Sequence, residues 1–216
     1  MIDTDRATRL EGALAALPLV AILRGLKPVE AEGIGRVLYD AGFRLIEVPL
    51  NSPDPFDSIA ALRRLLPPEA LVGAGTVLEV EQAQRLSALG ADLVVMPHAD
   101  TEVIRAAKQR GMICLPGVAT PTEAFAALRA GADALKLFPG ELISPVVVKA
   151  MRAVLPHGTR LMPVGGISPE TMGPYLDVGV TGFGLGSALY APGMRPEQVA
   201  ERAARFVAAW KERHPP

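Results

Sequence analysis

Cysteine, histidine and lysine are scarce in this chain of 216 residues, which contains one, three and five of them respectively. The single cysteine, Cys114, lies in a short apolar run, so we expect a buried, inert thiol. One cysteine can form neither a disulfide framework nor a cysteine-based metal site. The three histidines are scattered along the sequence and predict no metal cluster.

Long hydrophobic runs and an excess of charge of either sign are also absent. No apolar run approaches ~18 residues, and residues 1–11 mix acidic and basic side chains, so we expect neither a signal peptide nor a membrane anchor. The 22 basic and 23 acidic residues give a net charge of -1. This balance argues against a nucleic-acid or membrane-surface partner, and a cytoplasmic protein is the default expectation.

The sequence does contain a repeating pattern of a predicted strand, a turn and a helix. Half of the residues are hydrophobic, which suffices for a large core. Short, nearly continuous apolar runs recur along the chain, as expected for strands of a parallel sheet buried on both faces. The eight runs are residues 19–23, 45–48, 71–74, 93–96, 113–115, 134–138, 161–164 and 183–186.

The segments between these runs carry signals for the start and the end of helices. Thr120 precedes Pro121 and Glu123, which predicts an N-cap, a proline at the first helical position and a reciprocal glutamate. Ser168 followed by Pro169 predicts a second start of this kind. Glycines shortly before the next strand predict helix C′ positions. These glycines are Gly42, Gly90, Gly111, Gly131 and Gly179.

Eight alternations with short loops favour an α/β protein that is a single (β/α)8 TIM barrel spanning residues 1–216. We expect an N-terminal helical segment at 1–18, a barrel core at 19–190 and a C-terminal helix at 191–216. An open doubly wound sheet is the alternative. It would usually show fewer strands and a glycine-rich first turn, and residues 24–28 contain no dinucleotide-binding fingerprint.

Lys136 is the sharpest functional signal, because it is the only lysine placed within a predicted strand. Strand alternation puts Lys136 on one face with Ala134 and Phe138, and Leu135 and Leu137 on the other. If the leucines face the helices, Lys136 points into the barrel, where burial lowers the pKa of its amine. A neutral amine can condense with a carbonyl group. The alternative is a lysine buried in a structural ion pair with Glu47.

Three more polar residues fall in or at the ends of predicted strands, where barrel active sites are built. Glu47 could transfer protons near the amine, or it could be the other half of a structural ion pair. Arg24 suits a ligand carboxylate or, equally, a salt bridge at the barrel mouth. Thr76 could donate its hydroxyl to the same carboxylate or bond to the backbone.

Two glycine clusters at the last two strands suggest a phosphate site. Gly165 and Gly166 precede the predicted helix start at Ser168, and exposed N–H groups at such a start attract anions. Gly186 and Ser187 end the eighth run, and barrels often bind phosphate between the loops after strands seven and eight. Ordinary tight-turn glycines are the alternative.

Taken in order, these motifs resemble a known family over residues 19–190. The chain is similar to the class I (β/α)8 aldolases that cleave 2-keto-3-deoxy-6-phosphogluconate or 2-keto-3-deoxy-6-phosphogalactonate. The resemblance is carried by residues 22–25, 46–51, 73–77, 134–139 and 164–167.

The resemblance implies a role for each of these residues. Lys136 would form the Schiff base, Glu47 would be the general acid/base, Arg24 and Thr76 would hold the substrate carboxylate, and Phe138 would line the pocket. The phosphate group would lie at Gly165, Gly166, Gly186 and Ser187. The implied products are pyruvate and glyceraldehyde 3-phosphate, formed without a metal or organic cofactor, and the resemblance implies a homotrimer.

Two positions bear on the choice of substrate. The gluconate-type enzymes commonly have Thr-Leu-Arg where this chain has Pro-Leu-Asn ending at Asn51, and Thr where it has Val164. Both positions are similar to the galactonate branch, and the two substrates are epimers at carbon 4. Gluconate or dual specificity stays open. So do an isomerase or epimerase that uses Glu47 without a covalent adduct, and a phosphosugar-binding protein without turnover.

Overall fold

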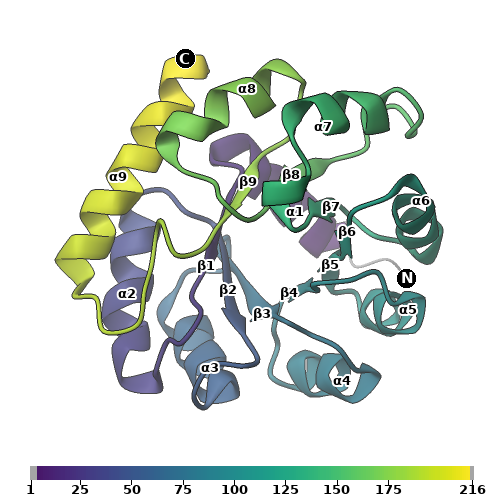
Figure 1. Ribbon diagram of the computed structural model, residues 1–216. Helices are drawn as coiled ribbons and strands as arrows, with labels where there is room; N and C mark the ends of the chain where they lie inside the picture. The colour runs from purple at the N-terminus through teal and green to yellow at the C-terminus, as the bar shows by residue number, and fades with distance from the viewer. Residues whose placement is uncertain (1–3, 215–216) are drawn as a thin grey trace.

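The computed structural model describes residues 4–214, which form an α/β fold with a curled parallel sheet at its centre and helices around it (Figure 1). All paired strands run parallel. The strands are β1 Leu19–Ile22, β2 Leu45–Pro49, β3 Leu71–Gly75, β4 Leu93–Val95, β5 Ile113–Leu115, β6 Gly117–Val118, β7 Leu135–Leu137, β8 Leu161–Pro163 and β9 Phe183–Leu185.

Each of the eight predicted runs contains a strand, and the structure adds a ninth that the sequence did not predict. The strands are ordered β5-β4-β3-β2-β1-β9 in one sheet and β6-β7-β8 in the other. β5 and β6 are separated only by Pro116, which has no N–H to donate. The two sheets also meet between β8 and β9, where an isolated parallel bridge joins Val164, which follows β8, to Gly184 in β9.

Within the described residues a helix follows each strand except β5, and α1 precedes β1. They are α1 Thr4–Ala16, α2 Pro28–Asp40, α3 Pro55–Leu65, α4 Val80–Ala88, α5 Thr101–Gln109, α6 Pro121–Ala130, α7 Pro145–Arg152, α8 Met172–Asp177 and α9 Pro196–Arg213, with 3-10 turns η1 Gly140–Leu142 and η2 Pro169–Thr171. None of the helices within residues 4–214 combines the length and apolar character that crossing a membrane requires.

The helix-end signals were largely correct. At the start of α6, the Glu123 N–H donates to Thr120 Oγ1 at 3.3 Å and the Thr120 N–H donates to Glu123 Oε2 at 2.9 Å. The helix start predicted at Ser168 needs correction, because Ser168 leads into the 3-10 turn η2 and α8 begins only at Met172. The five glycines predicted to end helices all have positive φ, between 71° and 105°.

The core is divided into two clusters by the sheets. The larger cluster lies between strands and helices and contains Leu135 and Leu137. The smaller contains Ala134 together with apolar residues from β1 to β5 and β8, and α1 contributes Leu10 and Ala13 to it. The predicted facing of β7 is therefore confirmed: its leucines meet the helices, and Ala134 lies on the other side.

A buried carboxylate connects α1 to the sheet. Asp92, only 1% exposed, precedes β4 and accepts a hydrogen bond from the Val72 N–H at 3.1 Å. Arg6 Nε, Arg9 Nη1 and Arg63 Nη1 lie 3.5, 3.0 and 3.3 Å from its oxygens. Ion pairs to a carboxylate excluded from water depend on all partners staying in place, so this cluster ties α1 and α3 to β3 and β4.

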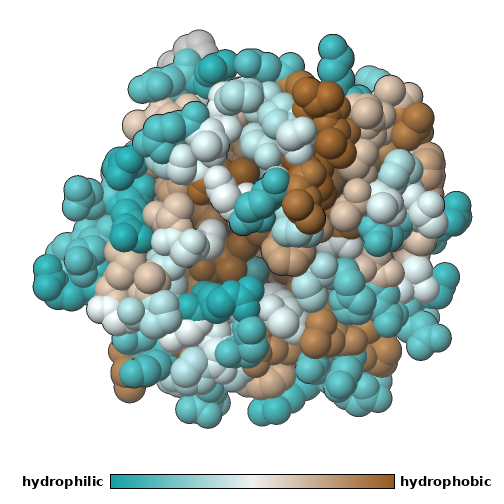
Figure 2. Space-filling view, in the orientation of Figure 1, coloured by the Kyte–Doolittle hydropathy of each residue, from teal (hydrophilic) through white to brown (hydrophobic). Residues whose placement is uncertain are grey.

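One part of the surface is notably apolar. Figure 2 shows hydrophobic side chains gathered over α7. The exposed large hydrophobic residues there include Leu142, Val146, Val147 and Val154, with 76, 78, 38 and 57% of their surfaces accessible. Apolar surface of this kind commonly marks an interaction site.

Candidate active site

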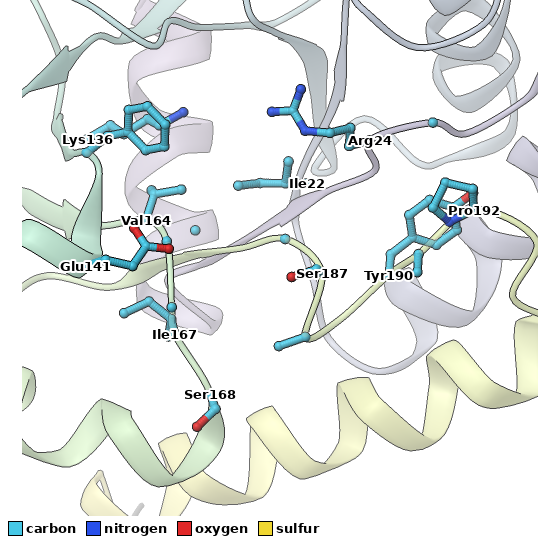
Figure 3. A pocket seen from close by; sticks show the side chains of 18 of the residues that line it. Ile22, Arg24, Lys136, Glu141, Val164, Ile167, Ser168, Ser187, Tyr190 and Pro192 are labelled. Carbon is cyan, nitrogen blue, oxygen red and sulfur yellow. The ribbon is translucent and has the colours of Figure 1, made fainter.

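A pocket of about 600 Å³ opens at the carboxyl ends of the strands, where the loops that follow them converge (Figure 3). It brings together nine of the eleven residues that the sequence analysis singled out. These are Arg24, Asn51, Lys136, Phe138, Val164, Gly165, Gly166, Gly186 and Ser187. The remaining two, Glu47 and Thr76, lie outside this pocket.

Lys136 lies in the middle of β7 and is 7% exposed. Its Nζ lies 4.6 Å from the centre of the Phe138 ring. Burial lowers the pKa of Lys136, the carboxylate of Glu47 opposes this, and the positive charge of Arg24 adds to the lowering. The result favours the neutral amine, the form of lysine that attacks a carbonyl carbon.

Glu47 lies on β2 and is 1% exposed. It lines a small cavity together with Lys136 and Val164, so the two ionisable groups face one space next to the main pocket. Burial raises the pKa of Glu47 to about 7, although Lys136 and Arg24 pull it down. A carboxyl group with such a pKa can both accept and return a proton near neutral pH.

The Glu47 carboxylate is not fully hydrogen-bonded by the described residues. Its Oε2 is buried without a hydrogen-bond partner among residues 4–214. A static structural ion pair would predict a direct contact between Glu47 and Lys136, and no ion pair joins these two side chains among residues 4–214. Buried unsatisfied acceptors are rare in native proteins, and they often mark a catalytic role or a ligand.

Gly75 makes room for this carboxylate, a relation that the sequence analysis missed. A Cβ atom built on Gly75 would lie 1.8 Å from Glu47 Oε2. The sequence did contain a signal, since a glycine at the end of a strand can mark a site where another group approaches the backbone closely.

Arg24 is held by the segment that follows β2. Its Nη1 donates to Asn51 Oδ1 at 2.7 Å, and the Gly25 N–H donates to Ser52 Oγ at 2.9 Å. Arg24 is therefore positioned by an amide and a hydroxyl, whereas the alternative from the sequence was a salt bridge at the barrel mouth. The guanidinium keeps its charge and its other donors for a ligand.

Thr76 is not brought to the site by the structure. It follows β3 with a φ of 55°, and it lines neither the main pocket nor the small cavity.

At the other end of the pocket, the backbone forms two turns. Gly165 and Gly166 have φ values of 111° and 65°, which favour glycine and expose backbone N–H groups. Gly186 and Ser187 follow β9, and Arg202 Nη1 donates to the Ser187 carbonyl at 3.0 Å.

Further lining residues come from loops and were missed by the sequence analysis. Glu141 belongs to η1, and Tyr190 follows β9. The Tyr190 hydroxyl donates to Glu30 Oε2 at 3.4 Å. Burial, with Glu30 next to it, raises the pKa of Tyr190 to about 12, so this hydroxyl stays protonated. Only four residues separate Glu141 in η1 from Lys136 in β7, and this short spacing was the available signal.

Known proteins resemble this chain over most of its length. A family model for KDPG and KHG aldolases matches residues 10–202. The 2-dehydro-3-deoxy-6-phosphogalactonate aldolase of Escherichia coli (strain K12) is 48% identical over 196 residues, covering 91% of this chain and 96% of that protein. A probable 2-dehydro-3-deoxy-6-phosphogalactonate aldolase of Rhizobium meliloti (strain 1021) is 49% identical over 193 residues, covering 89% and 91%.

The structural comparison points in the same direction. A solved structure described as native KDPGal superposes with a TM-score of 0.89 at 48% identity. The match covers 91% of this chain and 95% of that one. The fold is therefore similar over nearly the whole length of both chains.

Proposed function

The chain belongs to the KDPG and KHG aldolase family and is thus a carbon–carbon lyase, and we propose that it cleaves 2-dehydro-3-deoxy-6-phosphogalactonate into pyruvate and glyceraldehyde 3-phosphate. The observation that carries this proposal is the pair of Lys136 and Glu47. A buried amine of lowered pKa and a buried carboxyl group of pKa about 7 face the same space beside a 600 Å³ pocket.

The reaction starts at Lys136. Its neutral amine attacks the ketone at carbon 2, and loss of water with uptake of one proton from solvent gives a protonated imine. Glu47, whose pKa is raised by burial to about 7, takes the proton of the carbon 4 hydroxyl in its ionised form, directly or through one water.

Cleavage follows from that proton transfer. The bond between carbons 3 and 4 breaks, its electron pair moves into the imine to give an enamine, and carbon 4 becomes the aldehyde of glyceraldehyde 3-phosphate. Protonation of the enamine carbon by Glu47 forms the pyruvate imine. Water then hydrolyses the protonated imine, releasing pyruvate and one proton and restoring the neutral amine of Lys136.

The two ends of the pocket suit the two charged ends of the substrate. Arg24, oriented by Asn51, offers the planar donors that bind a carboxylate. The turns at Gly165–Gly166 and at Gly186–Ser187 offer backbone N–H groups and a hydroxyl to the phosphate. Thr76 is not part of this assignment, because it lies outside the pocket.

Val164 supports the galactonate over its carbon 4 epimer. It lines both the main pocket and the cavity that Glu47 and Lys136 share, next to where carbon 4 would react. An apolar side chain here gives no hydrogen bond to a hydroxyl, which favours the epimer whose hydroxyl points elsewhere.

We also infer that the two sheets belong to one closed (β/α)8 barrel. The Val164–Gly184 bridge at one seam and the single residue between β5 and β6 at the other support closure. The exposed apolar surface over α7 supports a homotrimer, in which that surface would be covered.

Borohydride reduction in the presence of saturating pyruvate tests the central claim. We expect a pyruvate-derived adduct that peptide mass mapping places on Lys136, and its absence in Lys136→Arg. Lys149→Arg, on the exposed side of α7, is the matched control and should keep the adduct. An unmodified Lys136 in folded wild-type protein would refute the aldolase mechanism. The ratio of kcat/KM for the two epimers tests the choice of substrate.

A further inference from the structure

Glu141 places a negative charge at the end of the pocket that we assign to phosphate. Only three charged side chains line the main pocket within residues 4–214, namely Arg24, Lys136 and Glu141. The phosphate end itself is lined by backbone turns and the serine hydroxyls of Ser168 and Ser187. Nothing in the reaction proposed above uses this carboxylate.

The side chain lies directly on the glycine turn. A Cβ atom built on Gly165 would be 2.4 Å from Glu141 Oε2, and one on Gly166 would be 3.3 Å from Glu141 Cγ. Figure 3 shows the Glu141 carboxylate beside Val164, on the same side of the pocket as Ile167. The carboxylate therefore lies against the turn whose N–H groups would meet a phosphate.

Hydrogen bonds hold the backbone that carries Glu141, whereas none is found for its side chain within residues 4–214. The Gly140 N–H donates to the Val164 carbonyl at 2.7 Å. The Tyr175 hydroxyl donates to the carbonyls of Gly140 and Ile143 at 3.3 and 3.1 Å. The Glu141 side chain is exposed, and within the described part of the chain its carboxylate has no hydrogen bond or ion pair.

We propose that Glu141 is a specificity-determining residue that competes with phosphate for the Gly165–Gly166 turn and weakens the binding of phosphorylated ligands. This inference rests on the proposed function. An incoming phosphate must displace the carboxylate and then remain near its charge, because η1 stays in place. The repulsion acts at the phosphate end, so it lowers affinity for the phosphorylated substrate and speeds release of glyceraldehyde 3-phosphate, with little effect on pyruvate.

The test compares wild-type protein with Glu141→Gln, which keeps the shape and removes the charge. We expect the inhibition constant of inorganic phosphate and the KM of the phosphorylated substrate each to fall roughly five- to tenfold. The kcat should change by less than about twofold, and borohydride trapping of pyruvate should match the wild type. Glu81→Gln, an exposed residue in the first turn of α4, is the matched control for net charge and should shift neither constant.

Two results would overturn the role of Glu141. Constants equal to those of the wild type would show that the carboxylate does not oppose phosphate, and raised constants would show that it helps to bind the ligand. Direct calorimetric titration with inorganic phosphate measures the same shift without turnover. Failure of wild-type protein to trap pyruvate would refute the proposed aldolase reaction instead, so the two failures are distinguishable.

Discussion

Replacing Gly75 by alanine is expected to disable the enzyme while leaving its fold intact. The added methyl group would stand 1.8 Å from Oε2 and 2.4 Å from Cδ of Glu47. Cβ atoms essentially never approach other heavy atoms closer than 3.0 Å, so the carboxylate must move by more than about 1 Å. Glu47 is 1% exposed, and the only cavity found to be lined by it within residues 4–214 is the small one that it shares with Lys136, so a displaced carboxylate changes its position relative to the amine.

The size of the effect follows from this displacement. Misplacing a catalytic group by about 1 Å can cost roughly 100-fold in rate, so we expect the kcat of Gly75→Ala to fall about 100-fold or more. Overpacking of a buried site costs about 1–3 kcal/mol, which a well-packed domain can lose and stay folded. Lys136 is not touched directly, so pyruvate should still be trapped on it.

The assay combines steady-state cleavage, borohydride trapping and denaturant unfolding. Gly12→Ala is the control, because a Cβ there meets nothing within 4 Å, and it should retain full activity. If the effect acts through Glu47, adding Gly75→Ala to a Glu47→Gln background should cost little further activity. A folded Gly75→Ala protein with kcat within about threefold of wild type would refute the reasoning.

Three further predictions follow from the buried charges and from the pocket wall. Asp92→Asn leaves three arginines without their shared carboxylate, so urea unfolding should show a loss of about 3 kcal/mol, and a loss below about 1 kcal/mol would contradict the role of the cluster. Burial raises the pKa of Glu47 from 4.5 to about 7, so the folded protein holds this proton more tightly than the unfolded chain and loses stability as pH rises between these values. Above about pH 8, the free energy of unfolding of Glu47→Gln, measured with a denaturant, should therefore exceed that of the wild type by about 3 kcal/mol. Below about pH 4 the two free energies should be equal, and equal values at both pH values would disprove the shift. Val164→Thr should shift kcat/KM toward the gluconate epimer by about tenfold, and an unchanged ratio of the two epimers would remove Val164 from the specificity argument.

The sequence predicted those parts of the fold and site that depend on local periodicity. Alternation along β7 placed Lys136 and Ala134 on the inner face, because successive strand residues must point to opposite sides. The capping pair of Thr120 and Glu123 was readable for the same reason, since its partners are three residues apart. Short-range patterns of this kind can be recognised in the sequence without knowledge of the tertiary structure.

What the sequence did not predict depends on contacts between distant segments. Gly75 meets Glu47 only because β2 and β3 are paired in one register, and Glu141 meets Gly165 only because η1 lies against the end of β8. Ser168 was predicted to start an α-helix, but its N–H donates to Thr171 Oγ1 at 2.8 Å and the chain makes a 3-10 turn first. Periodicity carries no information on such pairings.

The position of α1 has a consequence for the order in which the chain is assembled. This helix is synthesised first, yet Arg9 binds a carboxylate 83 residues further along the sequence. Its apolar residues Leu10 and Ala13 also pack against strands that the ribosome has not yet made. A nascent chain that ends before Asp92 lacks the carboxylate that holds Arg9, so we expect α1 to complete its contacts with the sheet only after β4 and β5 have been made.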